Sequence, residues 1–340
     1  MSALPPGVSG GDAELEARLS EGLGRVEAVL SGVLDSTDPI ASAVTHHLAE
    51  AGGKRLRPLL TLLTAGLGDA GRPEIVDAAA VVELTHLASL YHDDVMDAAP
   101  LRRGAPSAHE VFGASAAILA GDLLFAKASL LVAGLGPEAV RVQARTFERL
   151  CLGQLHETVG PAPGEDPVRH HLSVLSDKTG ALIATAARFG AWLAGCPPET
   201  VDAVVAYGEK AGVAFQLADD VIDLTADPTH TGKTPGTDLR DGVATMPQLL
   251  VEAEARRDAA AGRGETAAMA LARDMGGDLA QDAALDSVVA RLTAHPATAR
   301  TRELARSWAA EAVAQLAPLP DGPVKVALEA FATLAARRLA

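Results

Sequence analysis

Apolar residues recur every three or four positions through most of the chain, which is the spacing of helices that bury one face. Residues 12–34 show this clearly, and Asp12 stands where a side chain can cap the first turn. The pattern predicts further helices over residues 38–50, 59–67, 73–96, 114–133, 137–159, 167–194 with a break near 177–180, and 197–224, and it continues after 246. Runs of β-branched residues are few, so the pattern predicts an all-α fold.

Charge and cysteine usage narrow the class of protein. The net charge of −15, from 44 acidic and 29 basic residues, argues against a nucleic-acid partner. Cys151 and Cys196 lie in separate apolar helices without metal-site spacing, so both are expected to be reduced structural thiols. The first ten residues show no secretory signal pattern, and no run reaches about 18 uninterrupted apolar residues. We therefore expect a soluble cytosolic chain without a membrane-spanning helix.

Two of the predicted helices end in the same acidic pattern, D-D-x-x-D. The six carboxylates are Asp93, Asp94 and Asp97 in one helix and Asp219, Asp220 and Asp223 in the other. On a helix the first and last aspartates of each bank share a face, while the middle one lies about 100° away. Oxygen ligands of this kind suit Mg²⁺, which substrate phosphates complete. A single copy is as often a solvated helix end, but two copies predict banks that hold Mg²⁺ against a diphosphate.

A basic turn stands before another predicted helix, where Gly52-Gly53 is followed by Lys54-Arg55-Leu56-Arg57-Pro58. Backbone N–H groups and guanidinium groups meet at such a turn and favour an anion, although alone the segment is more typical of a solvated turn. Two other motifs fail on spacing. Gly232-Lys233-Thr234 lacks the first glycine of a P-loop, and His156-Glu157 lacks the second histidine of a zinc-protease helix.

With these motifs in order, the chain resembles the trans-isoprenyl diphosphate synthases of the polyprenyl synthetase family, medium- or long-chain type, from about residue 15 to about residue 335. The motifs that carry the resemblance are G-G-K-R-x-R-P, the first D-D-x-x-D with a trailing R-R-G, K-T-G, and Q-x-x-D-D-x-x-D. The resemblance implies one all-α domain over 12–340, after a flexible segment 1–11. It further implies a helical bundle around a deep central cavity, usually as a homodimer, with the aspartate banks facing each other across the cavity mouth.

The resemblance also assigns roles to single residues. The six aspartates would bind about three Mg²⁺ ions that hold an allylic diphosphate, which Arg102, Lys178 and Lys233 would also contact. Isopentenyl diphosphate would be held by Lys54, Arg57, His86 and Arg103, and Thr179 and Gln216 would flank the reacting carbons. The chain departs from the family pattern at 241–244, where many members carry a further lysine and this chain has none.

The chemistry that these groups favour is ionisation followed by condensation. Cations must neutralise the departing diphosphate, and the allylic carbocation must meet an alkene before water, so a closed apolar cavity is expected. Short-chain relatives carry a bulky aromatic four or five residues before the first aspartate, where this chain has Ser89 and Ala88. Because Thr85 is also small, and with Phe147 as a hypothetical floor, we expect a medium-to-long all-trans product, beyond C20 and in the range C30 to C50.

Three alternatives stay open. A geranylgeranyl-type short-chain synthase would share these motifs. A class I terpene cyclase also carries D-D-x-x-D, but its second metal site is normally N/D-D-x-x-S/T-x-x-x-E, and Lys54 and Arg57 favour a second diphosphate. A regulatory subunit of a heteromeric synthase typically loses one aspartate bank. The favoured hypothesis is a cytoplasmic prenyltransferase, compatible with a transient membrane contact for product release.

Overall fold

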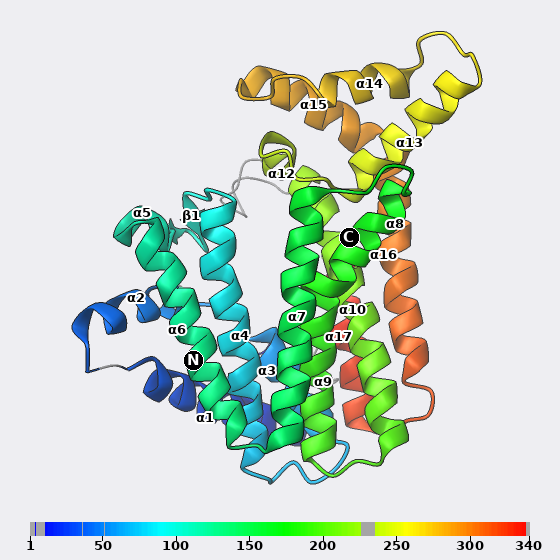
Figure 1. Cartoon of the computed structure of the whole chain (residues 1–340). Coiled ribbons are helices and arrows are strands. Elements are labelled where there is room, and N and C mark those ends of the chain that lie inside the picture. The colour runs from blue at the N-terminus through cyan, green and yellow to red at the C-terminus, as the bar shows by residue number, and fades with distance from the viewer. Residues whose placement is uncertain (1–3, 5–10, 36, 51, 226–234, 338–340) are drawn as a thin grey trace. The chain divides into compact units, whose positions relative to one another are not determined.

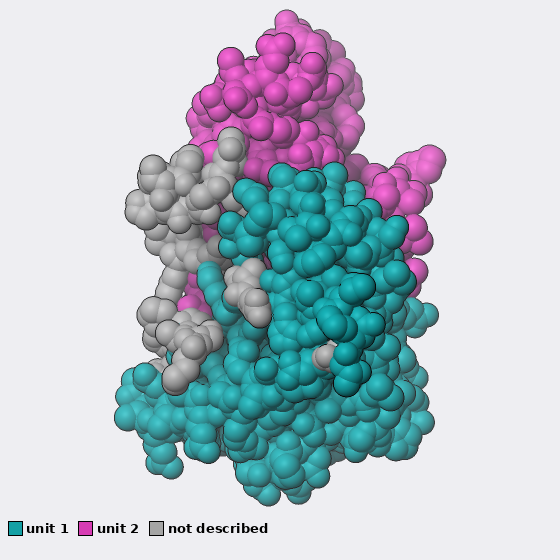
Figure 2. Space-filling view, turned by 90° about the vertical axis from the view of Figure 1, so that its left-hand side faces the viewer, with its two compact units in different colours: residues 1–150, 180–209, 312–331 teal, residues 151–179, 210–311, 332–340 magenta. Residues whose placement is uncertain are grey.

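Regular structure in the described part of the chain is almost entirely helical (Figure 1), as the hydrophobic pattern predicted. The computed structural model describes all residues except 1–3, 5–10, 36, 51, 226–234 and 338–340. The chain divides into two compact units, distinguished by colour in Figure 2. Unit 1 comprises residues 1–150, 180–209 and 312–331, and unit 2 comprises residues 151–179, 210–311 and 332–340. The single domain expected from the sequence stays a prediction.

Unit 1 is built around α4 (Glu74–Met96), which packs against helices from both earlier and later parts of the chain. The unit contains α1 (Ala13–Leu34), α2 (Pro39–Glu50), α3 (Leu56–Ala65), the hairpin strands β1 (Leu101–Arg102) and β2 (Ala105–Pro106), α5 (Ala108–Phe112), α6 (Ala114–Ala133), α9 (Ala181–Leu193), and parts of α7 (Pro137–Val159), α10 (Pro198–Thr225) and α17 (Pro323–Arg337). α4 is apolar around most of its circumference, and it is buried almost continuously from Ile75 to Ala88. A helix of that composition requires neighbours on all sides.

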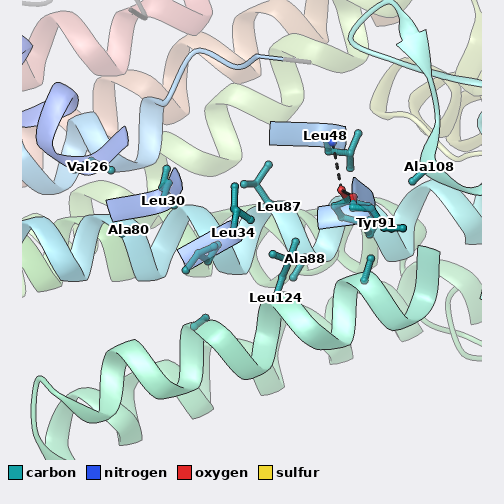
Figure 3. Close-up of a cluster of buried hydrophobic side chains, with 14 of the residues drawn as sticks. Val26, Leu30, Leu34, Leu48, Ala80, Leu87, Ala88, Tyr91, Ala108 and Leu124 are labelled. Atoms are coloured by element: carbon teal, nitrogen blue, oxygen red, sulfur yellow. Dashed lines mark hydrogen bonds between the residues drawn. The ribbon is translucent and has the colours of Figure 1, made fainter. Parts of the chain in front are cut away.

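Tyr91 ties α4 to α2 within this core (Figure 3). Its hydroxyl donates to Val44 O and accepts a hydrogen bond from Leu48 N at 3.2 Å. The side chain is fully buried, and burial raises the pKa of Tyr91 to about 12, so the hydroxyl keeps the proton that it donates. Because Tyr91 stands two residues before Asp93, these bonds fix the end of α4 that carries the first aspartate bank.

A close approach at Gly190 holds α9 against α3. A Cβ atom at this position would lie 2.1 Å from Thr61 O and 2.2 Å from Thr64 Oγ1, far inside van der Waals contact. The backbone approach therefore requires glycine. This contact packs α3, whose first turn contains Arg57, against α9, the helix that follows the K-T-G motif.

Unit 2 contains the second aspartate bank and the remaining helices. These are the end of α7, α8 (Pro167–Leu175), the π-helix η1 (Ser176–Gly180), the second part of α10, α12 (Thr237–Arg240), α13 (Met246–Ala260), α14 (Ala267–Met275), α15 (Asp282–Ala294) and most of α16 (Pro296–Gln315). A hydrophobic cluster that includes Leu271, Leu285 and Leu292 joins α13, α14 and α15. A second cluster around Leu217 and Met246 joins α10 to α13.

Most predicted helices form within one or two residues of their expected bounds, and Asp12 accepts a hydrogen bond from Leu15 N as the expected cap. Three short elements replace expected loop: the β1–β2 hairpin, α5 and α12. α3 begins at Leu56, three residues earlier than expected, because the left-handed backbone of Arg55 turns the chain directly into the helix.

Among the described helices, α6 is long and apolar enough to cross a membrane by length and composition alone. Its 20 residues include a window of mean hydropathy 1.8, of which 33% is buried. Core helices of soluble proteins meet the same criteria, and α6 packs along α4. The high hydropathy of α6 thus reflects apolar residues on its outer face as well as on the face that packs against α4.

Candidate active site

The basic turn contains one arginine that is already fully engaged. Arg55 has a left-handed backbone, with φ 48°, and its guanidinium is only 6% exposed. Arg55 Nε lies 2.6 Å from Glu27 Oε1 on α1, and Nη1 lies 2.8 Å from Glu83 Oε1 on α4. The neighbouring Lys54 is exposed and Arg57 is half-buried. Arg55 therefore has a structural role, unlike Lys54 and Arg57, which are expected to bind substrate.

Arg57, Arg103 and His86 gather on the same side of unit 1. The guanidinium of Arg103 lies against Gly53, where a Cβ atom would stand 2.8 Å from Arg103 Nη1. The pKa of Arg57 is lowered to about 10, chiefly by burial; Glu83 opposes this shift, and the nearby Arg103 adds to it. Arg57 Nε is buried and has no hydrogen-bond partner among the described residues. Two neighbouring guanidinium groups that repel each other, of the half-buried Arg57 and the exposed Arg103, form a site that an anion would stabilise.

His86 faces the same arginines. Burial, and then the charges of Arg57, Arg103, Arg102 and Arg55, hold the pKa of His86 well below its usual range. The imidazole is therefore neutral near pH 7, so it can donate one hydrogen bond without adding charge. The structure thus brings together three of the four residues expected at the isopentenyl diphosphate site, with Lys54 exposed in the adjoining turn.

The aspartates of the first bank are not equivalent. Asp94 is fully buried, and its Oδ1 accepts from Arg102 Nε at 2.6 Å and from Nη2 at 2.5 Å. Burial raises the pKa of Asp94, and the ion pair with Arg102 opposes that shift. Asp93 is half-buried and Asp97 is exposed. The structure therefore turns the middle aspartate inward, where it holds Arg102 of the β1–β2 hairpin.

The second bank repeats this division in unit 2. Asp220 is 7% exposed, and its Oδ2 accepts from Met246 N at 2.9 Å and lies 3.1 Å from His171 Nε2. Asp219 and Asp223 are half-buried. Gln216 lies one turn before Asp220 on the same helix and is also half-buried. Asp220 is thus anchored to α8 and to the first turn of α13.

Lys178 and Thr179 lie in a π-helix, which explains the predicted break in the helix. Lys178 forms an ion pair with Glu157 on α7, and Thr179 is 8% exposed. Gly153 permits the close approach of the two helices, since a Cβ atom there would lie 2.7 Å from Lys178 N. π-turns often mark functional positions because the wider turn redirects side chains. The sequence analysis did not identify Glu157 as a partner of Lys178. In the sequence it appeared only in His156-Glu157, which was rejected as a zinc-protease motif.

The residues expected to govern product length give a mixed result. Ala88 and Thr85 are fully buried on α4, and Ser89 Oγ donates to His86 O at 2.9 Å. Phe147, the hypothetical floor, is 36% exposed, and its ring lies against Phe125 with centroids 4.2 Å apart, so its role in product length stays a prediction.

Gln143, one turn earlier on α7, occupies the buried position instead. Its Nε2 donates to Thr85 Oγ1 at 2.5 Å, and the residue is 7% exposed. The next turn of α7 also forms a buried bridge, because Thr146 Oγ1 lies 2.6 Å from Thr185 Oγ1 on α9. Lys233 lies outside the described residues.

The carboxylates of the two banks suit a metal ion whose coordination shell is completed by the substrate. No three His, Cys, Asp or Glu side chains in the described ranges are grouped to hold a metal ion alone. Mg²⁺ commonly takes only one or two carboxylates, with waters and substrate phosphates completing its shell. The pairs Asp93 with Asp97 and Asp219 with Asp223 fit that role by residue type and helical spacing.

The fold and these motifs define an all-helical protein equipped to bind diphosphates with cations and metal ions. A model of the polyprenyl synthetase family matches residues 38–267. The chain belongs to the polyprenyl synthetase family and is a prenyltransferase, as the sequence motifs predicted.

Individual relatives are similar along nearly the whole chain. The nonaprenyl diphosphate synthase of Mycobacterium tuberculosis is 43% identical over 328 residues, which cover 96% of this chain and 95% of that protein. The heptaprenyl diphosphate synthase component 2 of Geobacillus stearothermophilus is 37% identical, over 71% of this chain and 76% of that one. The solved geranylgeranyl pyrophosphate synthase of Corynebacterium glutamicum, complexed with calcium and isoprenyl diphosphate, superimposes with a TM-score of 0.83 at 40% identity, over 96% and 98% of the chains.

Proposed function

We propose that the protein condenses isopentenyl diphosphate with an allylic diphosphate, head to tail, to make an all-trans polyprenyl diphosphate. The arrangement of Arg57, Arg103 and His86 is the observation that supports this proposal most directly. These neighbouring donors would form a second anion site beside the Asp94–Arg102 pair of the first aspartate bank. One diphosphate would suffice for a terpene cyclase, whereas condensation requires two.

The reaction breaks the allylic C–O bond, and the electron pair leaves with the diphosphate. The alkene of isopentenyl diphosphate then supplies the electrons of the new C–C bond, and a proton is lost, which the released pyrophosphate can accept. Arg102 and Lys178 would bind the leaving diphosphate, while Arg57, Arg103, His86 and Lys54 would hold the second substrate. Thr179 and Gln216 would line the reacting carbons. The reaction requires that water be kept from the carbocation.

In each bank, the first and last aspartates would bind metal, and the buried middle aspartate would not. We assign Asp93, Asp97, Asp219 and Asp223 as ligands of about three Mg²⁺ ions, which supply charge neutralisation to the departing diphosphate. Asp94 and Asp220 would act indirectly, Asp94 through Arg102 and Asp220 through its contacts with Met246 N and His171. The calcium and isoprenyl diphosphate bound by the Corynebacterium protein support a divalent ion at such a site. Lys233 keeps its expected contact with the allylic diphosphate as part of this proposal.

The outer face of α6 supports the proposed homodimer. Exposed positions recur every three or four residues along the helix, and the apolar members include Ile118, Leu119 and Leu130 at 43%, 65% and 78% exposed. Val140 and Phe147 on α7 add further exposed apolar area. Contiguous apolar surface of this kind marks an interface. A second copy of the chain is the proposed partner in a cytoplasmic enzyme, and contact with a membrane during product release would be transient.

The product is proposed to be medium to long, within C30 to C50. Ala88 and Ser89 carry small side chains near the first bank, and the Mycobacterium relative is named for a nonaprenyl product. The 40% identity to a geranylgeranyl synthase keeps a shorter product as the second candidate, and the buried Gln143–Thr85 bond, one turn before Ala88 on α4, favours it.

Incubation of the purified chain alone with Mg²⁺, isopentenyl diphosphate and a set of allylic primers tests the proposal. Chromatography of the dephosphorylated products is expected to show an all-trans series with a sharp upper length. A cyclic hydrocarbon would identify a cyclase. Activity that appears only after a second protein is added would instead match the component relationship suggested by the Geobacillus relative.

A further inference from the structure

Arg55 joins three elements of unit 1 at one buried point. Its guanidinium contacts Glu27 of α1 through Nε at 2.6 Å and Nη2 at 3.4 Å, and it contacts Glu83 of α4 through Nη1 at 2.8 Å. Nη2 also lies 3.5 Å from Ala49 O at the end of α2. Each of the three guanidinium nitrogens thus has a protein acceptor, so the contacts of Arg55 tie it to the protein framework.

The backbone of Arg55 indicates that this arrangement is specific. The residue adopts φ 48°, a left-handed conformation that non-glycine residues rarely take. The surrounding contacts must stabilise that conformation. It also sets the direction in which α3 begins, and Arg57 lies in the first turn of that helix.

Glu83 explains why a neutral side chain would not serve as well as Arg55. This carboxylate is 2% exposed on α4, and it acts electrostatically on Arg57 and Arg103 as well as on Arg55. Without Arg55, the negative charge of Glu83 would attract the two guanidinium groups proposed to bind a diphosphate and would repel the diphosphate itself.

We propose that Arg55, held between Glu27 and Glu83, is a positioning residue that keeps Arg57 and Arg103 available for isopentenyl diphosphate. This inference rests on the proposed function. It adds a role for three residues, none of which touches substrate, and it is specific to one of the two substrates because Arg102 is held separately by Asp94.

Steady-state kinetics with each substrate varied in turn tests the inference. Arg55→Met is expected to raise KM for isopentenyl diphosphate by at least about tenfold, as loss of one partner of a buried ion pair does, with little change in KM for the allylic primer. The double variant Arg55→Met with Glu83→Gln removes the uncompensated charge and is expected to recover most of that loss. Asp94→Asn is the matched control and is expected to affect the allylic KM instead.

Arg55→Lys keeps the charge but loses the forked contacts, so it provides a milder variant if Arg55→Met does not fold. It is expected to raise KM for isopentenyl diphosphate by about threefold and to leave the allylic KM unchanged. Equal rises in both KM values, or a double variant no better than Arg55→Met, would overturn the positioning role. Failure of the wild-type chain to consume isopentenyl diphosphate would instead overturn the proposed function itself.

Discussion

The inward orientation of Asp94 leads to a prediction that separates it from its neighbour Asp93. Arg102 makes two charge-assisted contacts with Asp94 Oδ1, and hydrogen bonds to charged groups contribute about 1.5–3 kcal/mol. Asp94→Asn keeps one oxygen as an acceptor but removes the charge, so about 1.5–2 kcal/mol should be lost. At about 1.4 kcal/mol per factor of ten, kcat/KM for the allylic diphosphate is expected to fall roughly tenfold to thirtyfold.

The dependence of activity on Mg²⁺ distinguishes the two aspartates. Asp94→Asn should leave the half-saturating Mg²⁺ concentration unchanged, because Asp94 acts through Arg102. Asp93→Asn removes a proposed ligand and should raise that concentration by at least about tenfold. The assay is initial rate against Mg²⁺ at saturating isopentenyl diphosphate, with circular dichroism melting curves to confirm folding. If Asp94→Asn raised the Mg²⁺ requirement as strongly as Asp93→Asn, the assignment of Asp94 as a positioning residue would be refuted.

Three further predictions follow from contacts in the two units. Ala88→Phe should shorten the product and Gln143→Ala should lengthen it, as measured by chromatography of the dephosphorylated products. An unchanged product length in both variants would show that Ala88 and Gln143 do not control product length. Leu130→Glu places a charge on the exposed apolar stripe of α6 and should convert a dimer to monomers in analytical ultracentrifugation, whereas an unchanged sedimentation coefficient would contradict that interface. Glu157→Gln should lower kcat/KM for the allylic primer about fivefold by loosening Lys178, a loss of about 1 kcal/mol for a partly exposed ion pair; wild-type kinetics would show that Lys178 needs no such support.

The sequence predicted the long helices well because their apolar periodicity extends over many turns. Ala114–Ala133 and Pro137–Val159 formed with the expected bounds, and glycine and proline marked the loops between them. The β1–β2 hairpin was missed because each strand has only two residues, too few for an alternating pattern to show.

The candidate site was predicted by residue type but not by orientation. α4 is apolar around most of its circumference, so its pattern does not indicate which of the adjacent Asp93 and Asp94 points inward. Arg55 lies between Lys54 and Arg57 in the motif, and only the three-dimensional contacts with Glu27 and Glu83 distinguish its role. Such contacts join residues 28 positions apart in sequence, beyond the reach of local patterns.

The K-T-G motif lies in a π-helical turn, which holds one residue more than an ordinary α-helical turn. In the π-helix Ser176–Gly180 each backbone bond spans five residues rather than four, so deleting one residue there would restore an ordinary helix and rotate one flank relative to the other by about 100°. Lys178 and Glu157 would then no longer meet, although composition and charge would hardly change. The contact between Lys178 and Glu157 therefore depends on the length of this segment as well as on its side chains.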